Sequence, residues 1–199
     1  MNIVTQKQEY KGKTYFRNNA KWVDADHFVV PEYLQNILNT LVFDDKALEN
    51  MSYREAVDEG DKYKLSETYP LAIRYYEHAL KITDNISQAS VVLPRVTSCY
   101  RKLGQPGKVV EILSDAKAAY GENVINMALL TSVAAAYCDL GQPENAIRCC
   151  KWAYRVLKVN LEDRSFELTS VYERANKMLD KEYDRDEFFN ERDRLHFDK

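Results

Sequence analysis

The chain has 199 residues, 45% of them apolar and 30% charged, and its formal net charge is −3 at pH 7. This length suits one domain or a short array of repeats, and the composition is that of a folded protein rather than a disordered chain. The low net charge disfavours bulk attraction to nucleic acid or to anionic membranes, no apolar run approaches the roughly 18 residues of a membrane helix, and the N-terminus lacks the layout of a signal peptide.

Residues 1–30 differ in sequence pattern from the rest of the chain. Short β-prone pieces, at residues 3–5, 14–16, 21–23 and 27–30, are separated by Gly12 and by the pair at 18–19. Runs of this kind between turn residues are typical of short strands. The sequence therefore predicts a small N-terminal arm or hairpin.

The arm is rich in basic and aromatic side chains. Five basic residues and one acidic residue lie between positions 7 and 21, interleaved with Tyr10, Tyr15, Phe16 and Trp22. Such a mixture can hold single-stranded nucleic acid through phosphate contacts and base stacking. The favoured interpretation is that the aromatic residues pack the arm against the first repeat, because an isolated hairpin is marginally stable. A nucleic-acid-associated regulator that uses this arm is the alternative function.

Residues 31–52 are predicted to form a leading helix and a connector. Pro31 suits the first turn of a helix, and apolar residues follow at helical spacing as far as position 42. Ser52 and Glu55 then have the spacing of a capping box, in which each side chain accepts a hydrogen bond from the other residue's backbone N–H. A new helix is expected to begin at Tyr53.

Residues 53–158 repeat a pattern at an interval of 37. Tyrosines and small residues recur three times each, at Tyr63, Tyr100 and Tyr137, at Ala72, Val109 and Ala146, and at Ala79, Ala116 and Ala153. A fixed interval of 20 to 50 residues is typical of a solenoid, in which each unit buries its apolar face against the next. Each repeat is expected to contain two helices, and the small residues allow their axes to approach closely.

The turn between the two helices is also repeated. Gly104 and Gly141 suit the position after a helix end, and Pro106 and Pro143 suit the first position of the next helix. Pro94 interrupts the pattern, because its ring would clash with the carbonyl of Ser90. The helix that contains Pro94 is therefore expected either to start late, near Ser90, or to bend.

The first repeat resembles the tetratricopeptide repeat family. The resemblance is carried by the glycine, aromatic and small residues of its two helices, Gly60, Tyr63, Tyr69, Ala72, Tyr76, Ala79 and Leu80. It covers residues 53–158, although later repeats depart from the pattern and the interval exceeds the usual 34 residues. It implies an all-α fold, a short right-handed superhelix of helix pairs, with the small N-terminal arm before it.

The family resemblance also implies a binding surface. In such proteins the first helices of successive repeats line a concave groove that receives a peptide or helix from a partner. The matching positions here are Asp58, Asp61 and Lys64 in the first repeat, Arg95, Ser98 and Arg101 in the second, and Thr131 and Ser132 in the third. The predicted groove is acidic, then basic, then small and polar.

The C-terminal part is predicted to cap the array. Residues 159–182 carry one apolar stripe with polar flanks, as expected of a single amphipathic helix that ends a solenoid. Residues 183–199 form a charged tail with five large apolar side chains, Tyr183, Phe188, Phe189, Leu195 and Phe197. The tail could extend the helix, fold back into the groove, dock a partner or fray in solution, and self-association through its aromatic residues is a further alternative.

Nothing in the sequence indicates catalysis. The four cysteines show no paired spacing and lie in helical patterns, and no histidine stands at metal-ligand spacing from another histidine or cysteine. We therefore expect a cytoplasmic scaffold that binds a protein or peptide partner, with no enzymatic role, metal or cofactor. A subunit of a larger assembly is the third hypothesis.

Overall fold

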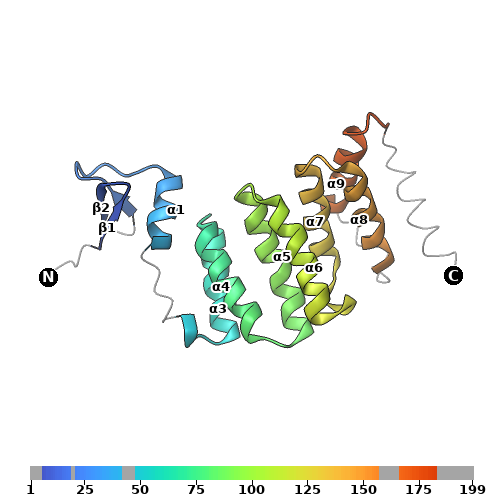
Figure 1. The fold of residues 1–199 in the computed structure, drawn as a ribbon, viewed down its shortest axis with the longest axis horizontal. Coiled ribbons are helices and arrows are strands. Elements are labelled where there is room, and N and C mark those ends of the chain that lie inside the picture. Colours follow the sequence, from blue (N-terminus) through green and yellow to red (C-terminus); the bar gives the residue numbers. More distant parts are fainter. Residues whose placement is uncertain (1–5, 19–20, 42–47, 157–165, 183–199) are drawn as a thin grey trace. The chain divides into compact units, whose positions relative to one another are not determined.

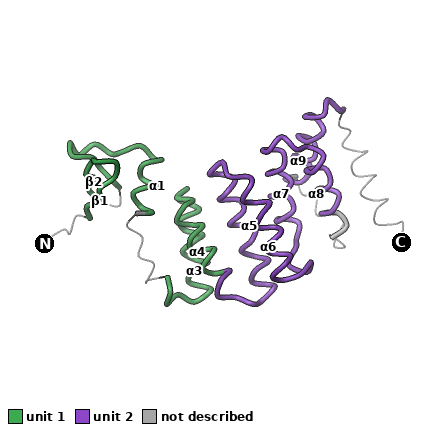
Figure 2. Tube along the Cα trace, viewed as in Figure 1, with its two compact units in different colours: residues 1–79 green, residues 80–199 purple. Residues whose placement is uncertain are grey.

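The computed structural model describes residues 6–18, 21–41, 48–156 and 166–182. Helices account for 70% of these residues, and eight α-helices pack in sequential pairs after a small three-stranded antiparallel sheet (Figure 1). The chain divides into two compact units, residues 1–79 and 80–199, which are described separately (Figure 2). Among the helices that the structure describes, none is long and apolar enough to span a membrane.

The two units contain the following elements in chain order. The first unit contains β1 (Lys7–Tyr10), β2 (Lys13–Asn18), β3 (Lys21–Val23), α1 (Glu32–Leu41), α3 (Tyr53–Leu65) and most of α4 (Tyr69–Ile82). The second unit contains α5 (Ile86–Lys102), α6 (Pro106–Tyr120), the 3-10 turn η1 (Glu122–Val124), α7 (Met127–Asp139), α8 (Pro143–Val156) and α9 (Phe166–Lys177).

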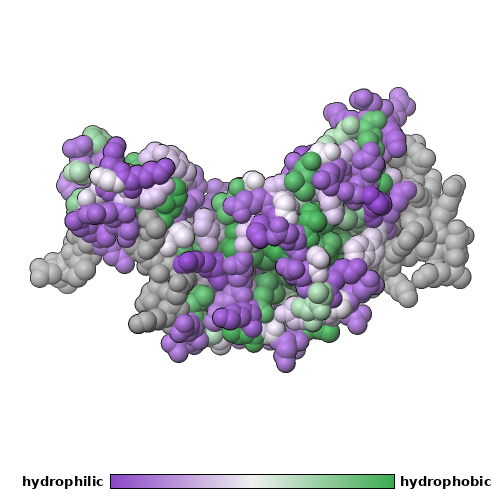
Figure 3. Space-filling view, viewed as in Figure 1, coloured by the Kyte–Doolittle hydropathy of each residue, from purple (hydrophilic) through white to green (hydrophobic). Residues whose placement is uncertain are grey.

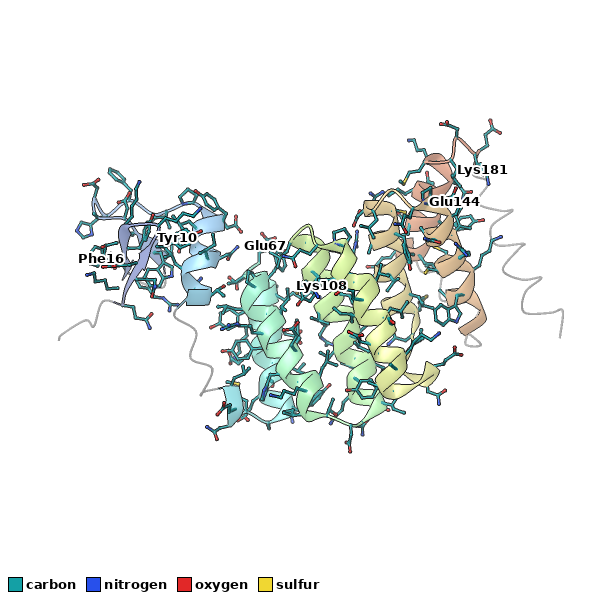
Figure 4. All side chains as sticks on the ribbon, in the orientation of Figure 1. Tyr10, Phe16, Glu67, Lys108, Glu144 and Lys181 are labelled. Atoms are coloured by element: carbon teal, nitrogen blue, oxygen red, sulfur yellow. The ribbon has the colours of Figure 1, made fainter. Side chains whose placement is uncertain are left out.

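The N-terminal arm is a sheet of three strands in the order β1-β2-β3. The β1–β2 turn consists of Lys11 and Gly12, whose φ angles of 49° and 73° are those of the tight hairpin turns that match strand twist. Tyr10 lies on the face of the sheet that packs with α1, whereas Phe16 lies on the opposite face (Figure 4). Two of the four expected β-prone pieces, 14–16 and 21–23, lie in β2 and β3. The piece at 27–30 forms only an isolated bridge at Val29, the piece at 3–5 lies outside the described residues, and β1 was not predicted.

The sheet is held to α1 by burial and by hydrogen bonds. Trp22 is fully buried in a cluster completed by Tyr15, Val30, Leu34 and Leu38. Its indole Nε1 donates to Asn39 Oδ1 at 2.8 Å, and its backbone N–H donates to Gln35 Oε1 at 2.7 Å. Tyr15 and Trp22 of the arm therefore pack on α1, where the sequence predicted packing on the first repeat.

The start of α3 follows the predicted capping box. The N–H of Glu55 donates to Ser52 Oγ at 3.4 Å, and the N–H of Ser52 donates to Glu55 Oε2 at 2.9 Å. The two bonds give partners to backbone N–H groups that would otherwise have no hydrogen-bond acceptor at the start of the helix. The helix ends at Leu65, with Ser66 as its C-cap, and α4 begins at Tyr69.

The repeated turns of the second unit are confirmed. Gly104 and Gly141 have φ angles of 69° and 71°, a region that glycine enters without steric cost. Pro106 and Pro143 are the first residues of α6 and α8. Local residue chemistry alone thus fixes where these helices end and restart.

Pro94 lies inside α5, which begins at Ile86 and continues to Lys102. The predicted late start near Ser90 is therefore wrong. Proline has no N–H, so the carbonyl of Ser90 loses its usual partner four residues later. That carbonyl instead accepts a hydrogen bond from Nδ2 of Asn126 at 2.7 Å, and Asn126 precedes α7. A side chain from the next helix pair replaces the missing backbone donor.

The helices of the second unit pack in chain order (Figure 1). Helix α7 contacts both α5 and α9, α6 packs against α5 and α7, and α8 packs against α7 and α9. The recurring small residues are buried in this packing, as the sequence predicted for Val109, Ala116, Ala146 and Ala153. In the first unit Ala72 and Ala79 are also fully buried.

Helix α9 corresponds to the central part of the predicted cap at 159–182. Leu168 and Ala175 bury its apolar stripe against the rest of the second unit. The first part of the predicted cap, residues 159–165, and the tail at 183–199 lie outside the described residues. The predicted boundaries of the repeats and tail therefore remain predictions.

Candidate functional site

The first-helix face is the surface of the second unit formed by α5, α7 and α9. It carries the predicted groove residues of α5 and α7 together with neighbours from the same layer, Val91, Arg95, Ser98, Arg101, Thr131, Ser132, Asp139 and Arg174. Residues that are about one repeat interval apart in the sequence meet across α5 and α7. Ser90 accepts a hydrogen bond from Asn126, and Arg101 donates to Asp139. The predicted residues of the second and third repeats are thus brought into one layer.

The middle of α5 presents an apolar and a basic side chain together. Val91 is 47% exposed, which is unusual for a large apolar residue within a packed helix layer. Arg95 lies one turn later, and its Nη1 donates to the Val91 carbonyl at 2.6 Å. Ser98 follows on the same helix and is half-buried. The side chain of Val91 is available for contact with a partner.

Arg101 is engaged in an ion cluster that links three helices. Its Nε donates to Oδ2 of Asp139 at 3.0 Å, and Nη1 of Arg174 donates to Oδ1 of the same carboxylate at 2.7 Å. Asp139 is the last residue of α7, while Arg101 and Arg174 belong to α5 and α9. The cluster ties the layer together. Arg101, which the sequence predicted as a groove residue, is paired with Asp139, and its role in partner binding stays a prediction.

The predicted groove residues Thr131 and Ser132 are buried. Both side chains are more than nine-tenths buried, and neither hydroxyl has a hydrogen-bond partner among the described residues. Unpaired buried hydroxyl groups reduce stability because they have lost their bonds to water. The sequence predicted small polar residues on an open groove at these positions, and the packed layer covers them.

Replacing the unpaired hydroxyl of Thr131 should stabilise the fold. Thr131→Val keeps the shape of the side chain and removes the unpaired hydroxyl, so we expect the free energy of unfolding to rise by up to about 1 kcal/mol. Thr97 is the matched control, since it is fully buried but its Oγ1 donates to Leu93 O at 2.9 Å. Thr97→Val should lower the stability by about 1 kcal/mol. Stability would be measured by urea denaturation. If the free energy of unfolding changed in the same direction in both variants, the assignment of an unpaired hydroxyl to Thr131 would be wrong.

The predicted groove residues of the first unit have different roles. Asp58 is exposed, and its Oδ2 lies 4.0 Å from Nε of Arg54, one turn earlier on α3. Asp61 accepts a 2.6 Å hydrogen bond from the hydroxyl of Tyr76, which is fully buried on α4. Lys64 is half-buried on α3. Asp61 therefore helps to hold α4 on α3, and its expected role in partner binding stays a prediction.

The basic aromatic arm does not expose all the aromatic rings that base stacking would use. Trp22 and Tyr15 are buried against α1, Tyr10 and Phe16 are partly exposed, and Phe28 is 71% exposed. Nζ of Lys11 lies 5.4 Å from the centre of the Tyr10 ring. Trp22 and Tyr15 form the core between the sheet and α1, so these two rings are not available for base stacking, and the nucleic-acid interpretation stays a prediction.

The four cysteines are buried, and Cys149 and Cys150 are poor nucleophiles at neutral pH. Burial raises the pKa of the Cys149 thiol to about 11, and it raises the pKa of Cys150 still further. A thiol with such a pKa stays protonated, and the thiolate is the reactive form. In the described ranges no three His, Cys, Asp or Glu residues converge to hold a metal ion.

The chain is a mostly helical protein whose helices pack in sequential pairs. In the second unit α5 and α7, the first helices of two pairs, contact each other, and α9 contacts α7. Comparisons with protein-family models, with curated proteins and with solved structures each give no match.

Proposed function

We propose that the chain is a protein-interaction module of the tetratricopeptide type, a right-handed solenoid of helix pairs that binds a peptide or helix of a partner protein on the first-helix face. The single observation that carries the proposal is the continuous layer of α5, α7 and α9, in which side chains from all three helices meet at Asp139. Stacked helices of this kind offer an extended surface whose contacts come from several elements.

The composition of the face supports a peptide ligand. Val91 offers exposed apolar area beside the guanidinium of Arg95, and half-buried Ser98 adds a hydroxyl. Interfaces combine apolar anchors with polar groups that fix the register of the ligand. The visible surface of the second unit likewise mixes hydrophilic and hydrophobic side chains (Figure 3). We place binding rather than catalysis on this face, and we place the protein in the cytoplasm.

Peptide selection with a matched pair of variants tests the proposal. The full chain would be used to select binders from a displayed library of random peptides. Val91→Asp should reduce capture of the selected peptides by about tenfold or more, because it places a charge where apolar contact is made. Ala118→Asp makes the same kind of change at an exposed position of α6, outside the first-helix layer, and should leave capture unchanged. Equal capture by Val91→Asp and the parent would place the binding surface elsewhere.

A further inference from the structure

The two edges of the N-terminal sheet differ in how their backbone groups are satisfied. In β3, the edge strand beside α1, Trp22 directs its backbone N–H and C=O away from β2. The N–H donates to Oε1 of Gln35 at 2.7 Å, and the C=O accepts from Nε2 of Gln35 at 2.8 Å and from the N–H of Val30 at 3.1 Å. The side-chain amide of Gln35 therefore takes the place of an additional strand, and the β3 edge is closed.

The other edge is formed by β1, and it is open. The N–H of Arg17 donates to the carbonyl of Gln6 at 2.8 Å. Because bonded and non-bonded pairs alternate along antiparallel strands, Lys7 and Glu9 direct their N–H and C=O groups away from β2. Among the described residues, the only partner of these outward groups is Nε2 of Gln8, which donates to the Glu9 carbonyl at 3.2 Å. An open edge of this kind is a template for another strand.

The side chains of the open edge are self-complementary. Lys7 and Glu9 lie on the face of the sheet away from α1, the face of Phe16, and their side chains are 58% and 73% exposed. If two copies of β1 pair antiparallel with Gln8 opposite Gln8, Lys7 of each copy lies opposite Glu9 of the other. In this register the outward N–H and C=O groups of Lys7 also meet those of Glu9, so the backbone and the charges favour the same alignment.

We propose that the open edge of β1 is a self-association surface, to which a second copy of this chain adds its own β1 to form one continuous antiparallel sheet. Lysine alone on an edge strand opposes such pairing, and Glu9 converts that repulsion into attraction in this register. The inference is independent of the proposed function, because it uses no residue of the first-helix face. A single short strand gives a small interface, so we expect a dissociation constant on the order of 0.1 mM.

Charge reversal tests the register. Lys7→Glu and Glu9→Lys each place like charges opposite one another, and each should raise the dissociation constant of the dimer by about tenfold or more. The double variant, Lys7→Glu with Glu9→Lys, restores opposite charges and should return to within about threefold of the parent. Lys21→Glu is the control, because it makes the same change of net charge as Lys7→Glu at an exposed position of β3, and it should leave the dissociation constant unchanged.

Sedimentation equilibrium of the full chain, over concentrations that bracket the expected dissociation constant, would measure association. Amide hydrogen exchange by NMR gives a second readout. The N–H groups of Lys7 and Glu9 should gain protection as the concentration rises, whereas the N–H of Gln8, which faces β2, should be protected at every concentration. An equimolar mixture of the Lys7→Glu and Glu9→Lys variants should associate, although each variant alone does not.

A chain that stays monomeric over this range would overturn the proposal. So would a dimer that both single variants leave unchanged, which would place self-association elsewhere, such as on the aromatic residues of the tail at 183–199. Failure of the folded double variant to recover would exclude the proposed register. If a charge variant does not fold, the parent decides the question, because Lys7 and Glu9 amides that gain no protection with concentration would also overturn the edge pairing.

Discussion

Gly60→Ala should lower the free energy of unfolding by about 3 kcal/mol, although alanine normally favours a helix interior over glycine by up to about 1 kcal/mol. A Cβ atom at Gly60 would lie 2.5 Å from Cε1 and 2.7 Å from Cδ1 of the Tyr76 ring. Tyr76 is fully buried, and its hydroxyl donates to Asp61. The ring cannot move away from α3 without losing this hydrogen bond to a carboxylate.

Gly107→Ala is the control for this prediction. Gly107 lies in the first turn of α6, where an added Cβ would meet nothing within 4 Å. This variant should be stabilised by up to about 1 kcal/mol through helix propensity alone. In a second test, Tyr76→Leu should remove most of the penalty of Gly60→Ala, so that the double variant loses less than the sum of the single losses. Denaturant melts in which both glycine variants gain stability would contradict the close approach of α3 and α4.

Asn126→Ala should also cost about 3 kcal/mol, because the side chain makes two different hydrogen bonds at once. Oδ1 of Asn126 accepts from the N–H of Leu129 at 2.9 Å and caps α7. Nδ2 donates to the carbonyl of Ser90 on α5, which Pro94 leaves without a backbone partner. Loss of the side chain uncaps one helix and leaves an unpaired carbonyl on another.

A double-mutant cycle separates the two roles of Asn126. Asn126→Ser keeps an N-cap acceptor but cannot reach the carbonyl of Ser90, so its cost of about 1 to 2 kcal/mol reports mainly the bond between helices. Pro94→Ala restores the backbone N–H that this carbonyl lacks. In the Pro94→Ala background, Asn126→Ser should therefore cost about 1 kcal/mol less than it does in the parent. Equal costs in the two backgrounds would show that Asn126 does not compensate for Pro94.

The boundaries of the helices were largely predictable because they depend on neighbouring residues. The capping box at Ser52, the positive φ of Gly104 and Gly141, and the prolines at the starts of α6 and α8 all act within a few residues of where they stand. The small residues that recur at an interval of 37 also indicated which side chains would be buried. The predicted late start of the helix that contains Pro94 was wrong. Pro94 removes one backbone hydrogen bond, and Asn126, 32 positions later, replaces it with a side-chain donor.

The candidate site was less predictable. Positions on the first helices could be named from their recurrence, but Arg101 and Thr131 were expected to line an open groove. The structure engages Arg101 with Asp139 and buries the hydroxyl of Thr131. Opposite charges close to one interval apart, at positions 101, 139 and 174, were a signal of the cluster that the sequence contained. Whether such residues pair depends on the side-chain directions of three packed helices.

The sequence by itself determined the helical class, two of the three N-terminal strands and the turns, because these features follow from backbone preferences of residues close together in the chain. Only the tertiary structure decided that the strands pack on α1 through Trp22, that Asn126 completes α5, and that Arg101, Asp139 and Arg174 form one cluster. Each of these contacts joins separate secondary-structure elements. Their energies depend on distances and burial that exist only after the helices have packed, which is why composition and spacing could not fix them.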